Sequence, residues 1–247
     1  MLPLTLRRQE LHQDEGGHAI WRITESAINL EPTKTCLLLC DLWNDHWCRG
    51  AVDRLAPLIP QWNRVIAAAR RQGIWIIHSP SEISEFYAGT PARERMRNLP
   101  RLELPPLREH ADPPLPVDDS DDGCDTGEMT WRQAWSRQHP GIEIDMERDG
   151  ISEDEGEIYS FIRQQGIDFI LFMGIHANMC VLNRPFGIKR WVRRGFPIAF
   201  VRDLTDAMYN PAMRPYVSHE TGTRLVVEYI EKFWCPTVLS ESLTGTV

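Results

Sequence analysis

Cys180 occupies a position in the sequence that suits a nucleophile. It ends the stretch 174–180 (GIHANMC), which follows an apolar run at 169–173 and precedes a segment with helical periodicity. This order predicts a sharp strand-to-helix turn that presents the thiol at the carboxyl edge of a sheet. The amino end of a helix lowers the pKa of a thiol, and the thiolate is the reactive form. We therefore expect a nucleophile here, the alternative being a small buried residue at the start of a helix.

Asp41 is the second candidate for chemistry. It directly follows the apolar run 35–40 (TCLLLC), which is typical of a buried parallel strand. An acid at the end of such a strand is costly unless it has a polar role. We expect a catalytic base, the alternative being a cap for the following turn.

Strands and helices alternate around these two residues. We predict strands at 35–41, 74–78, 142–144, 168–173 and 196–201, helices at about 55–72, 152–165, 180–195 and 220–232, and a last edge strand at 236–239. Such alternation predicts a three-layer, doubly wound α/β fold of the Rossmann-like kind, with a mostly parallel sheet covered on both faces. Ligands bind beyond the carboxyl ends of the strands in such sheets. Asp41, His78, Asp145 and Cys180 all fall at or just past predicted strand ends.

The rest of the chain divides around this core. The sequence predicts an N-terminal arm at 1–33, with a possible added strand at 18–23. It predicts a single domain at 34–240 and a tail at 241–247. Residues 79–140 interrupt the alternation with many prolines and an acidic stretch at 118–125. So long a segment without periodicity is typical of a functional insertion or a lid. The acidic stretch lacks the glutamate that closes a calcium loop and is expected to be a solvated surface loop.

Composition excludes several classes of partner. The 247 residues carry a formal net charge of −8, which argues against nucleic-acid and anionic-membrane partners. No apolar run is long enough to span a membrane, and the first residues lack the apolar segment of a secretory signal. Six cysteines without a repeating spacing predict reduced thiols, and hence a cytoplasmic location. The expected partner is a small-molecule substrate.

Two motifs resemble a known family. Residues 38–45 (LLCDLWND) and 174–180 resemble the strand motif and the nucleophile turn of the isochorismatase-like cysteine hydrolases, which include nicotinamidases, and the resemblance covers roughly residues 34–240. It implies the isochorismatase-like hydrolase fold and an Asp-Lys-Cys triad, and we expect no cofactor. Asp41 would deprotonate Cys180, which would attack an amide or related carbonyl. The amides around Ile175, His176 and Ala177, where the family usually has a cis bond, would form the oxyanion hole.

The lysine of this triad is missing. Its position, at the end of the strand predicted at 142–144, is occupied by Asp145, and no lysine occurs between Lys34 and Lys189. Arg148 is the nearest substitute; it could hold charge but could not give up a proton. Asp145 is either a site carboxylate or a solvated acid, and Arg148 could instead pair with its acidic neighbours.

Other side chains are candidates for contacts with the substrate or a metal. Trp43 and Tyr87 could line a pocket above the sheet or pack under the insertion, and His78 is a further candidate for a substrate contact. His46 and His78 suggest a metal, but they lack the clustered spacing of a metal site, and we predict none. The Trp and Pro content of the insertion suits contacts between subunits of a homo-oligomer.

Three functions are compatible with these features. The first is a hydrolase that cuts the C–N bond of a small amide through Cys180 and Asp41. The second is an isochorismatase-type vinyl ether hydrolase, which needs no cysteine; an acidic site would repel its dicarboxylate substrate. The third is an inactive family member that serves as a binding or scaffold protein, for which the missing lysine is the main support.

Overall fold

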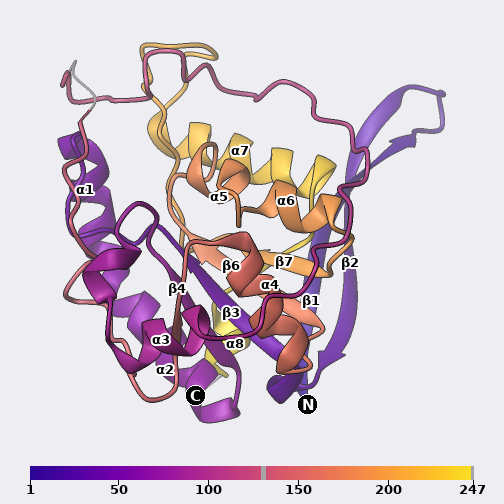
Figure 1. Cartoon of the computed structure of the whole chain (residues 1–247). Coiled ribbons are helices and arrows are strands. Elements are labelled where there is room, and N and C mark those ends of the chain that lie inside the picture. Colours follow the sequence, from indigo (N-terminus) through magenta and orange to yellow (C-terminus); the bar gives the residue numbers. More distant parts are fainter. Residues whose placement is uncertain (129–131, 246–247) are drawn as a thin grey trace.

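The computed structural model describes residues 1–128 and 132–245 and has an eight-stranded sheet at its centre (Figure 1). The strands lie in the order β2-β1-β8-β7-β6-β3-β4-β5. Their bounds are β1 (Leu2–Gln13), β2 (Ala19–Leu30), β3 (Thr35–Cys40), β4 (Trp75–Ser79), β5 (Gly150–Ile151), β6 (Phe169–Gly174), β7 (Ile198–Val201) and β8 (Thr237–Val238). All neighbours from β8 to β5 are parallel, whereas β1 is antiparallel to β2 and β8. The predicted α/β fold with a mostly parallel sheet is confirmed.

Helices cover both faces of this sheet. The helices are α1 (Arg49–Leu55), α2 (Ile59–Gln72), α3 (Pro91–Arg97), α4 (Glu155–Gln164), α5 (Cys180–Asn183), α6 (Ile188–Arg193), α7 (His219–Phe233) and α8 (Glu241–Thr244). Alternate residues of β3 face opposite ways, as a strand requires. Cys36 and Leu38 pack with residues of α4, α6 and α7, whereas Leu37 and Leu39 pack with residues of α2 and α8. The result is the expected three-layer arrangement.

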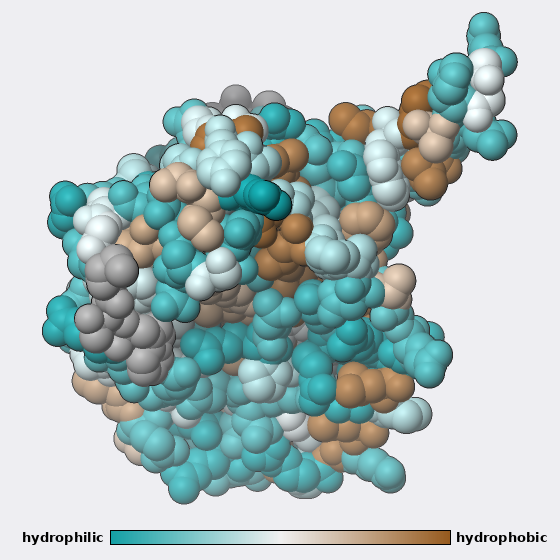
Figure 2. Space-filling model, turned by 90° about the horizontal axis from the view of Figure 1, so that it is seen from above, coloured by the Kyte–Doolittle hydropathy of each residue, from teal (hydrophilic) through white to brown (hydrophobic). Residues whose placement is uncertain are grey.

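The first thirty residues form a hairpin rather than an arm with one short strand. β1 and β2 pair from Leu2↔Leu30 to Gln13↔Ala19, and β1 joins the sheet through β8. The far end of the hairpin projects away from the body of the molecule (Figure 2). Because β1 continues the sheet, the segment 236–239 is not the predicted edge strand: β8 lies between β7 and β1.

The strand predicted at 142–144 is also wrong. Ile142 packs as a loop side chain into the apolar layer that includes α2, and the strand that pairs with β4 is β5. Between them, the amides of Arg148 and Asp149 both donate to the carbonyl of Asp145 and so form a turn. The following helix, α4, begins later than predicted, because Asp154 rather than Ser152 is its N-cap.

The insertion packs against the helical layer. After α3 the chain crosses the helices α4, α6 and α7 before it passes over the top of the molecule (Figure 1). The amide of Leu102 donates to Ser160, that of Arg108 donates to the carbonyl of Arg193, and the Tyr229 hydroxyl donates to the carbonyl of Pro113. Residues 129–131 of the predicted insertion and 246–247 of the predicted tail lie outside the described residues. Within the described ranges, no helix has both the length and the apolar character of a membrane span.

Candidate active site

The turn that carries Cys180 begins where β6 ends against β3. Gly174 is the last residue of β6, and a Cβ atom there would lie 2.5 Å from the carbonyl oxygen of Cys40. Only glycine therefore allows this close approach of the two strands. The chain then turns through His176, which has a φ of 62°, and enters α5 at Cys180. This geometry places Cys180 at the carboxyl edge of the sheet.

Asp41 lies at the same edge, one residue after β3. It has a φ of 53° and no exposed surface. Its Oδ1 accepts hydrogen bonds from the amide of Ser81, at 2.8 Å, and from the Ser81 hydroxyl. The thiol of Cys180 lies close enough for the charge of this carboxylate to act on it. The base and the nucleophile expected from the sequence therefore lie side by side.

Arg184 supplies a cation that the sequence reasoning missed. Its Nε lies 2.9 Å from Oδ2 of Asp41, and its Nη1 lies 3.0 Å from Glu82. Its guanidinium also lies 5.5 Å from the ring centroid of Trp43. Arg184 is four residues after Cys180, and its amide donates to the Cys180 carbonyl. Spacing of one helical turn was the signal that could have indicated it.

The helix after Cys180 is too short to activate the thiol as expected. α5 has four residues and ends before Pro185, and the next helix, α6, begins only at Ile188. Cys180 is half-buried. Burial raises the pKa of this thiol well above its ordinary value, the charge of Asp41 raises it further, and Arg184 opposes both. The expected lowering of the pKa is therefore wrong, and Cys180 rests as a thiol.

Asp41 is disposed to accept a proton. Burial raises the pKa of its carboxyl, while Arg184 and the two hydrogen bonds from Ser81 oppose the rise. A buried carboxylate with a raised pKa and a thiol beside it is the arrangement that a general base requires. Arg184 keeps its charge throughout, so it can hold the carboxylate in place without exchanging a proton.

Cys180 lines two cavities. One, of about 240 Å³, is lined by Trp43, His46, Trp47, Glu82, Asp122, Trp135, His176, Met179, Cys180, Arg184 and Met208. The other, of about 560 Å³, lies on the side of Asn178, Pro185 and Lys189. Lys189 does not replace the missing lysine, because it pairs with Asp112 at 2.8 Å.

Aromatic rings line the smaller cavity. Trp43 stacks on Trp135, with ring centroids 3.9 Å apart and planes at 6°. The ring of His46 lies 4.7 Å from that of His176, whose Nδ1 is 4.0 Å from the Cys180 sulfur. Burial lowers the pKa of His46 to about 4 and that of His176 well below its usual range, so both rings are neutral near pH 7. The side chain of His176, which the sequence reasoning overlooked, therefore adds a neutral polar group beside the nucleophile.

Two of the three amides expected in an oxyanion hole are already engaged. The amide of Ile175 donates to the Cys40 carbonyl at 3.4 Å, and that of Ala177 donates to the Asp206 carbonyl at 2.8 Å. The peptide bonds of this turn are trans; the cis bond within the described residues precedes Pro215. Of the expected donors, the amide of His176 is the one without a backbone carbonyl partner among the described residues.

The structure does not bring the remaining candidates to Cys180. His78 is fully buried between Gln138 and Asp149, and its ring nitrogens lie 3.0 Å from a side-chain oxygen of each. The Tyr87 hydroxyl accepts a hydrogen bond from the amide of Gln138. These two residues are thus held inside a polar network beside β4, and only Trp43 of the three expected substrate contacts reaches the cavity.

Asp145 and Arg148 lie at a different place from the nucleophile. Arg148 donates to the carbonyl of Arg70 and lines a hollow with Ile74 and Trp75, at the amino end of β4. The amide of Asp145 donates to Asp149. The position of the family lysine was misjudged because the strand before α4 is β5 and not 142–144. Neither residue can replace that lysine.

The acidic segment 118–125 contacts the site through polar side chains, so it is not a fully solvated surface loop. Asp119 accepts a hydrogen bond from Asn178 of the nucleophile turn at 2.8 Å, and Asp125 pairs with Arg54 at 2.7 Å. Arg54 also pairs with Asp206 at 2.9 Å. Near this segment, Cys48, Cys124 and Glu128 form a group that could hold a metal ion.

Comparisons with known proteins show relatives of the fold. No protein-family model and no curated protein matches the sequence. Among solved structures, a cysteine hydrolase from Pseudomonas syringae pv. phaseolicola 1448A is similar with a TM-score of 0.56 and 15% identity, over 87% of this chain and 92% of that one. An isochorismatase from Pseudomonas putida KT2440 is similar with a TM-score of 0.51 and 11% identity, over 86% and 91%. The chain therefore has the fold of the isochorismatase-like cysteine hydrolases.

Proposed function

We propose that this protein is a cysteine hydrolase that cuts the C–N bond of a small amide, with Cys180 as nucleophile, Asp41 as base and Arg184 in place of the family lysine. The observation that carries the proposal is the ion pair between Arg184 and Asp41 directly beside the thiol. The missing lysine was the main support for an inactive scaffold protein. A half-buried cation paired with the base removes that support.

The first half of the reaction forms a thioester. The carboxylate of Asp41 takes the thiol proton as the Cys180 sulfur bonds to the carbonyl carbon, and the carbonyl oxygen becomes an oxyanion. The C–N bond then breaks, and the nitrogen leaves with the proton that Asp41 received. The thiol needs no lowered pKa in the resting state, because its proton has an acceptor in Asp41 at the moment of attack.

The second half regenerates the thiol. Asp41 takes a proton from a water molecule that attacks the thioester, the C–S bond breaks, and Cys180 recovers its proton. The products are a carboxylic acid and an amine or ammonia. Arg184 holds the Asp41 carboxylate in place through both halves and remains charged, so one base serves both proton transfers.

The cavity supports a small substrate. About 240 Å³ admits a small molecule but not a folded protein, and the stacked pair Trp43 and Trp135 offers a flat apolar wall. We also propose a cytoplasmic homo-oligomer without an organic cofactor or a nucleic-acid or membrane partner. The six free thiols support the location, and exposed Leu11, Trp21 and Ile23 on the projecting hairpin support association between copies.

Acylation of the enzyme by an activated acyl donor tests the proposal. A p-nitrophenyl ester of a small carboxylic acid should acylate Cys180 in the wild type, seen by intact mass and peptide mapping, and release acid on standing. Cys180→Ala should show no adduct. Acylation of Cys180→Ala to the wild-type extent, or an inert wild-type thiol, would refute the covalent mechanism.

Two arginines allow a matched comparison in the same assay. Arg184→Ala should slow acylation on the order of 100-fold, because the base loses its cationic partner. Arg148→Ala should leave the rate unchanged, since Arg148 lies at the amino end of β4. The reverse order of effects would assign the role of the lysine to Arg148.

A further inference from the structure

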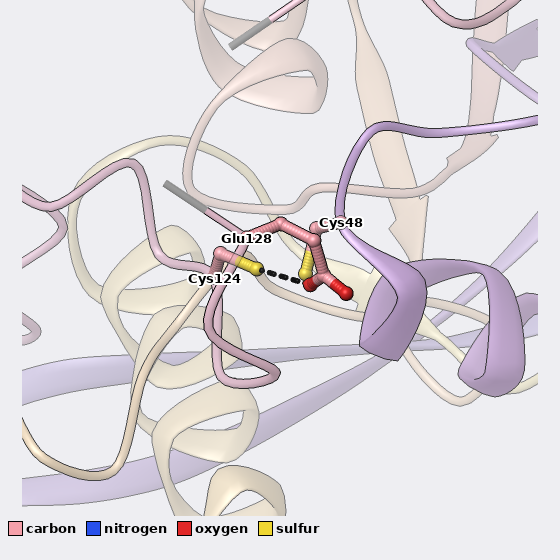
Figure 3. A group of neighbouring side chains, drawn as sticks. All are labelled: Cys48, Cys124 and Glu128. Carbon is pink, nitrogen blue, oxygen red and sulfur yellow. Dashed lines mark hydrogen bonds between the residues drawn. The ribbon is translucent and has the colours of Figure 1, made fainter. Parts of the chain in front are cut away.

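Two cysteines and a glutamate outside the proposed catalytic group converge near the start of α1. Cys48 is the N-cap of α1, whereas Cys124 and Glu128 belong to the insertion, more than seventy residues later in the chain (Figure 3). One ligand atom from each lies within 4.8 Å of the other two, and the Cys124 sulfur is 3.3 Å from Glu128 Oε2. Both cysteines are buried. No step of the proposed reaction uses these three residues.

The spacing of the three atoms is close to that of a tetrahedral zinc site. Zinc binds thiolates at about 2.3 Å and carboxylates at about 2.0–2.2 Å, which separates two bound sulfurs by about 3.8 Å and a sulfur from an oxygen by about 3.5 Å. The pair Cys124 and Glu128 already has this separation. To bring the Cys48 sulfur to these separations from the other two ligand atoms, side chains must move by about 1 Å, which rotation about their bonds allows. Thiolates favour zinc over magnesium or calcium.

The surroundings of the three residues are arranged to hold them. The Thr126 hydroxyl accepts a hydrogen bond from the amide of Gly50 at 3.0 Å and donates to the Glu128 carboxylate. Its oxygen also lies 3.6 Å from the Cys48 sulfur and 3.7 Å from the Cys124 sulfur. Outer groups that orient metal ligands in this way are a regular part of metal sites.

Gly50 gives a second, independent sign that the insertion is built to lie here. A Cβ atom at this position would collide with the side chain of Asp125. The first turn of α1 and the loop that carries Cys124 therefore lie in close contact here, with side chains of the loop packed over Gly50. The ion pair of Arg54 with Asp125 holds the same two segments together.

We propose that Cys48, Cys124 and Glu128 bind one Zn²⁺ ion, with water in the fourth position. On binding, each thiol loses its proton to solvent, and no electron is transferred. The ion fixes the insertion to α1, and the same segment contacts the nucleophile turn through Asp119 and Asn178. The role is structural: the metal holds one wall of the catalytic cavity and does not touch the proposed nucleophile.

Cobalt substitution gives a direct test on the full chain. Co²⁺ titrated into reduced, metal-free protein should produce a thiolate-to-cobalt charge-transfer band that saturates at one equivalent, and one equivalent of Zn²⁺ should remove it. Zn²⁺, but not Mg²⁺, should raise the melting temperature. The proposal is overturned if no band forms, or if the protein binds all divalent cations with the same affinity.

Single substitutions assign the ligands. Cys48→Ser and Cys124→Ser should each abolish the saturating band, and Thr126→Val, which removes only the orienting hydroxyl, should weaken binding about 10- to 100-fold. Cys180→Ala and Cys235→Ala are matched controls that should keep the full band. Should a serine variant fail to fold, Glu128→Gln and Thr126→Val still decide. Retention of wild-type affinity in both would contradict the assignment, as would loss of the band in Cys180→Ala.

Discussion

Two buried aspartates of this protein each pair with an arginine but differ in their affinity for a proton. Asp41 and Asp149 have at most 1% exposed surface. The Nε of Arg184 lies 2.9 Å from Asp41, and the Nε of Arg70 lies 3.0 Å from Asp149. The pKa of Asp41 is raised, whereas that of Asp149 falls to about 2. A single arginine therefore does not decide the protonation of a buried acid.

The number and kind of the hydrogen-bond donors make the difference. Burial raises the pKa of Asp149 as well, but hydrogen bonds from His78 and from two nitrogens of Arg70 outweigh this effect. The amide of Asp145 is a fourth donor, at 2.9 Å. Asp41 receives three donors where Asp149 has four: the amide and the hydroxyl of Ser81 and one nitrogen of Arg184. A carboxylate saturated with donors stabilises the fold, and one that is incompletely satisfied can take up a proton.

The largest expected effect separates the two aspartates by activity. Asp41→Asn should lower the turnover of an acyl substrate about 10²- to 10⁴-fold, because the general base is lost. Asparagine tolerates the positive φ of Asp41, so the backbone is not strained. Asp149→Asn should keep the turnover per folded molecule. Steady-state kinetics on both variants measures this difference; equal losses would mean that Asp41, too, acts through the fold.

The stability of the same two variants should reverse that order. Asp149→Asn should lower the free energy of unfolding at pH 7 by about 3 kcal/mol, because Arg70 loses its buried partner. Asp41→Asn should change it by less than about 1 kcal/mol, because the cost of a buried carboxylate is removed as the ion pair is lost. Urea unfolding of both variants tests the prediction.

The pH dependence of stability follows from the same pKa directions. The lowered pKa of Asp149 contributes stability above 3.8, its unfolded value, and this contribution is lost as the pH falls towards about 2. The raised pKa of Asp41 has the opposite sign, because ionisation of this group above 3.8 costs stability. Between pH 4 and pH 2 the wild type should therefore lose its advantage over Asp149→Asn. A difference that stays constant with pH would contradict the assignment.

A smaller effect is expected from exchanging each arginine for lysine. Arg184→Lys keeps a charge near Asp41 but cannot also hold Glu82 with a fixed fork, so turnover should fall only about tenfold. Arg70→Lys should leave turnover unchanged and cost on the order of 1 kcal/mol of stability. Steady-state kinetics measures the turnover of the two lysine variants, and urea unfolding measures their stability. Complete inactivity of Arg184→Lys would show that the guanidinium does more than supply charge.

The sequence predicted the pieces of the site that depend on strand ends. The apolar runs before Asp41 and Gly174 identify neighbouring parallel strands, and their carboxyl ends must meet, which brings Asp41 and Cys180 together. The three-layer arrangement of sheet and helices followed from the alternation of strands and helices in the sequence. These features are local patterns combined with general rules of sheet topology.

The missed features depend on contacts between distant parts of the chain. β5 has two residues, too few for a periodic signal, so the misplaced strand at 142–144 misdirected the search for the lysine. Arg184 reaches Asp41 across 143 residues of sequence. In the network of Arg70, His78 and Asp149, the contacts of Asp149 span 79 and 71 residues. No periodicity indicates which arginine pairs with which buried carboxylate.

Alkylation of Cys180 against pH tests the coupling of Asp41, Cys180 and Arg184 most directly, and it requires no substrate. In the wild type, the midpoint for reaction with iodoacetamide should lie above the value of about 8.5 for an ordinary thiol. Asp41→Asn should lower this midpoint because a neighbouring negative charge is removed, and Arg184→Ala should raise it because a positive charge is removed. A midpoint that neither substitution moves would contradict the proposed catalytic group.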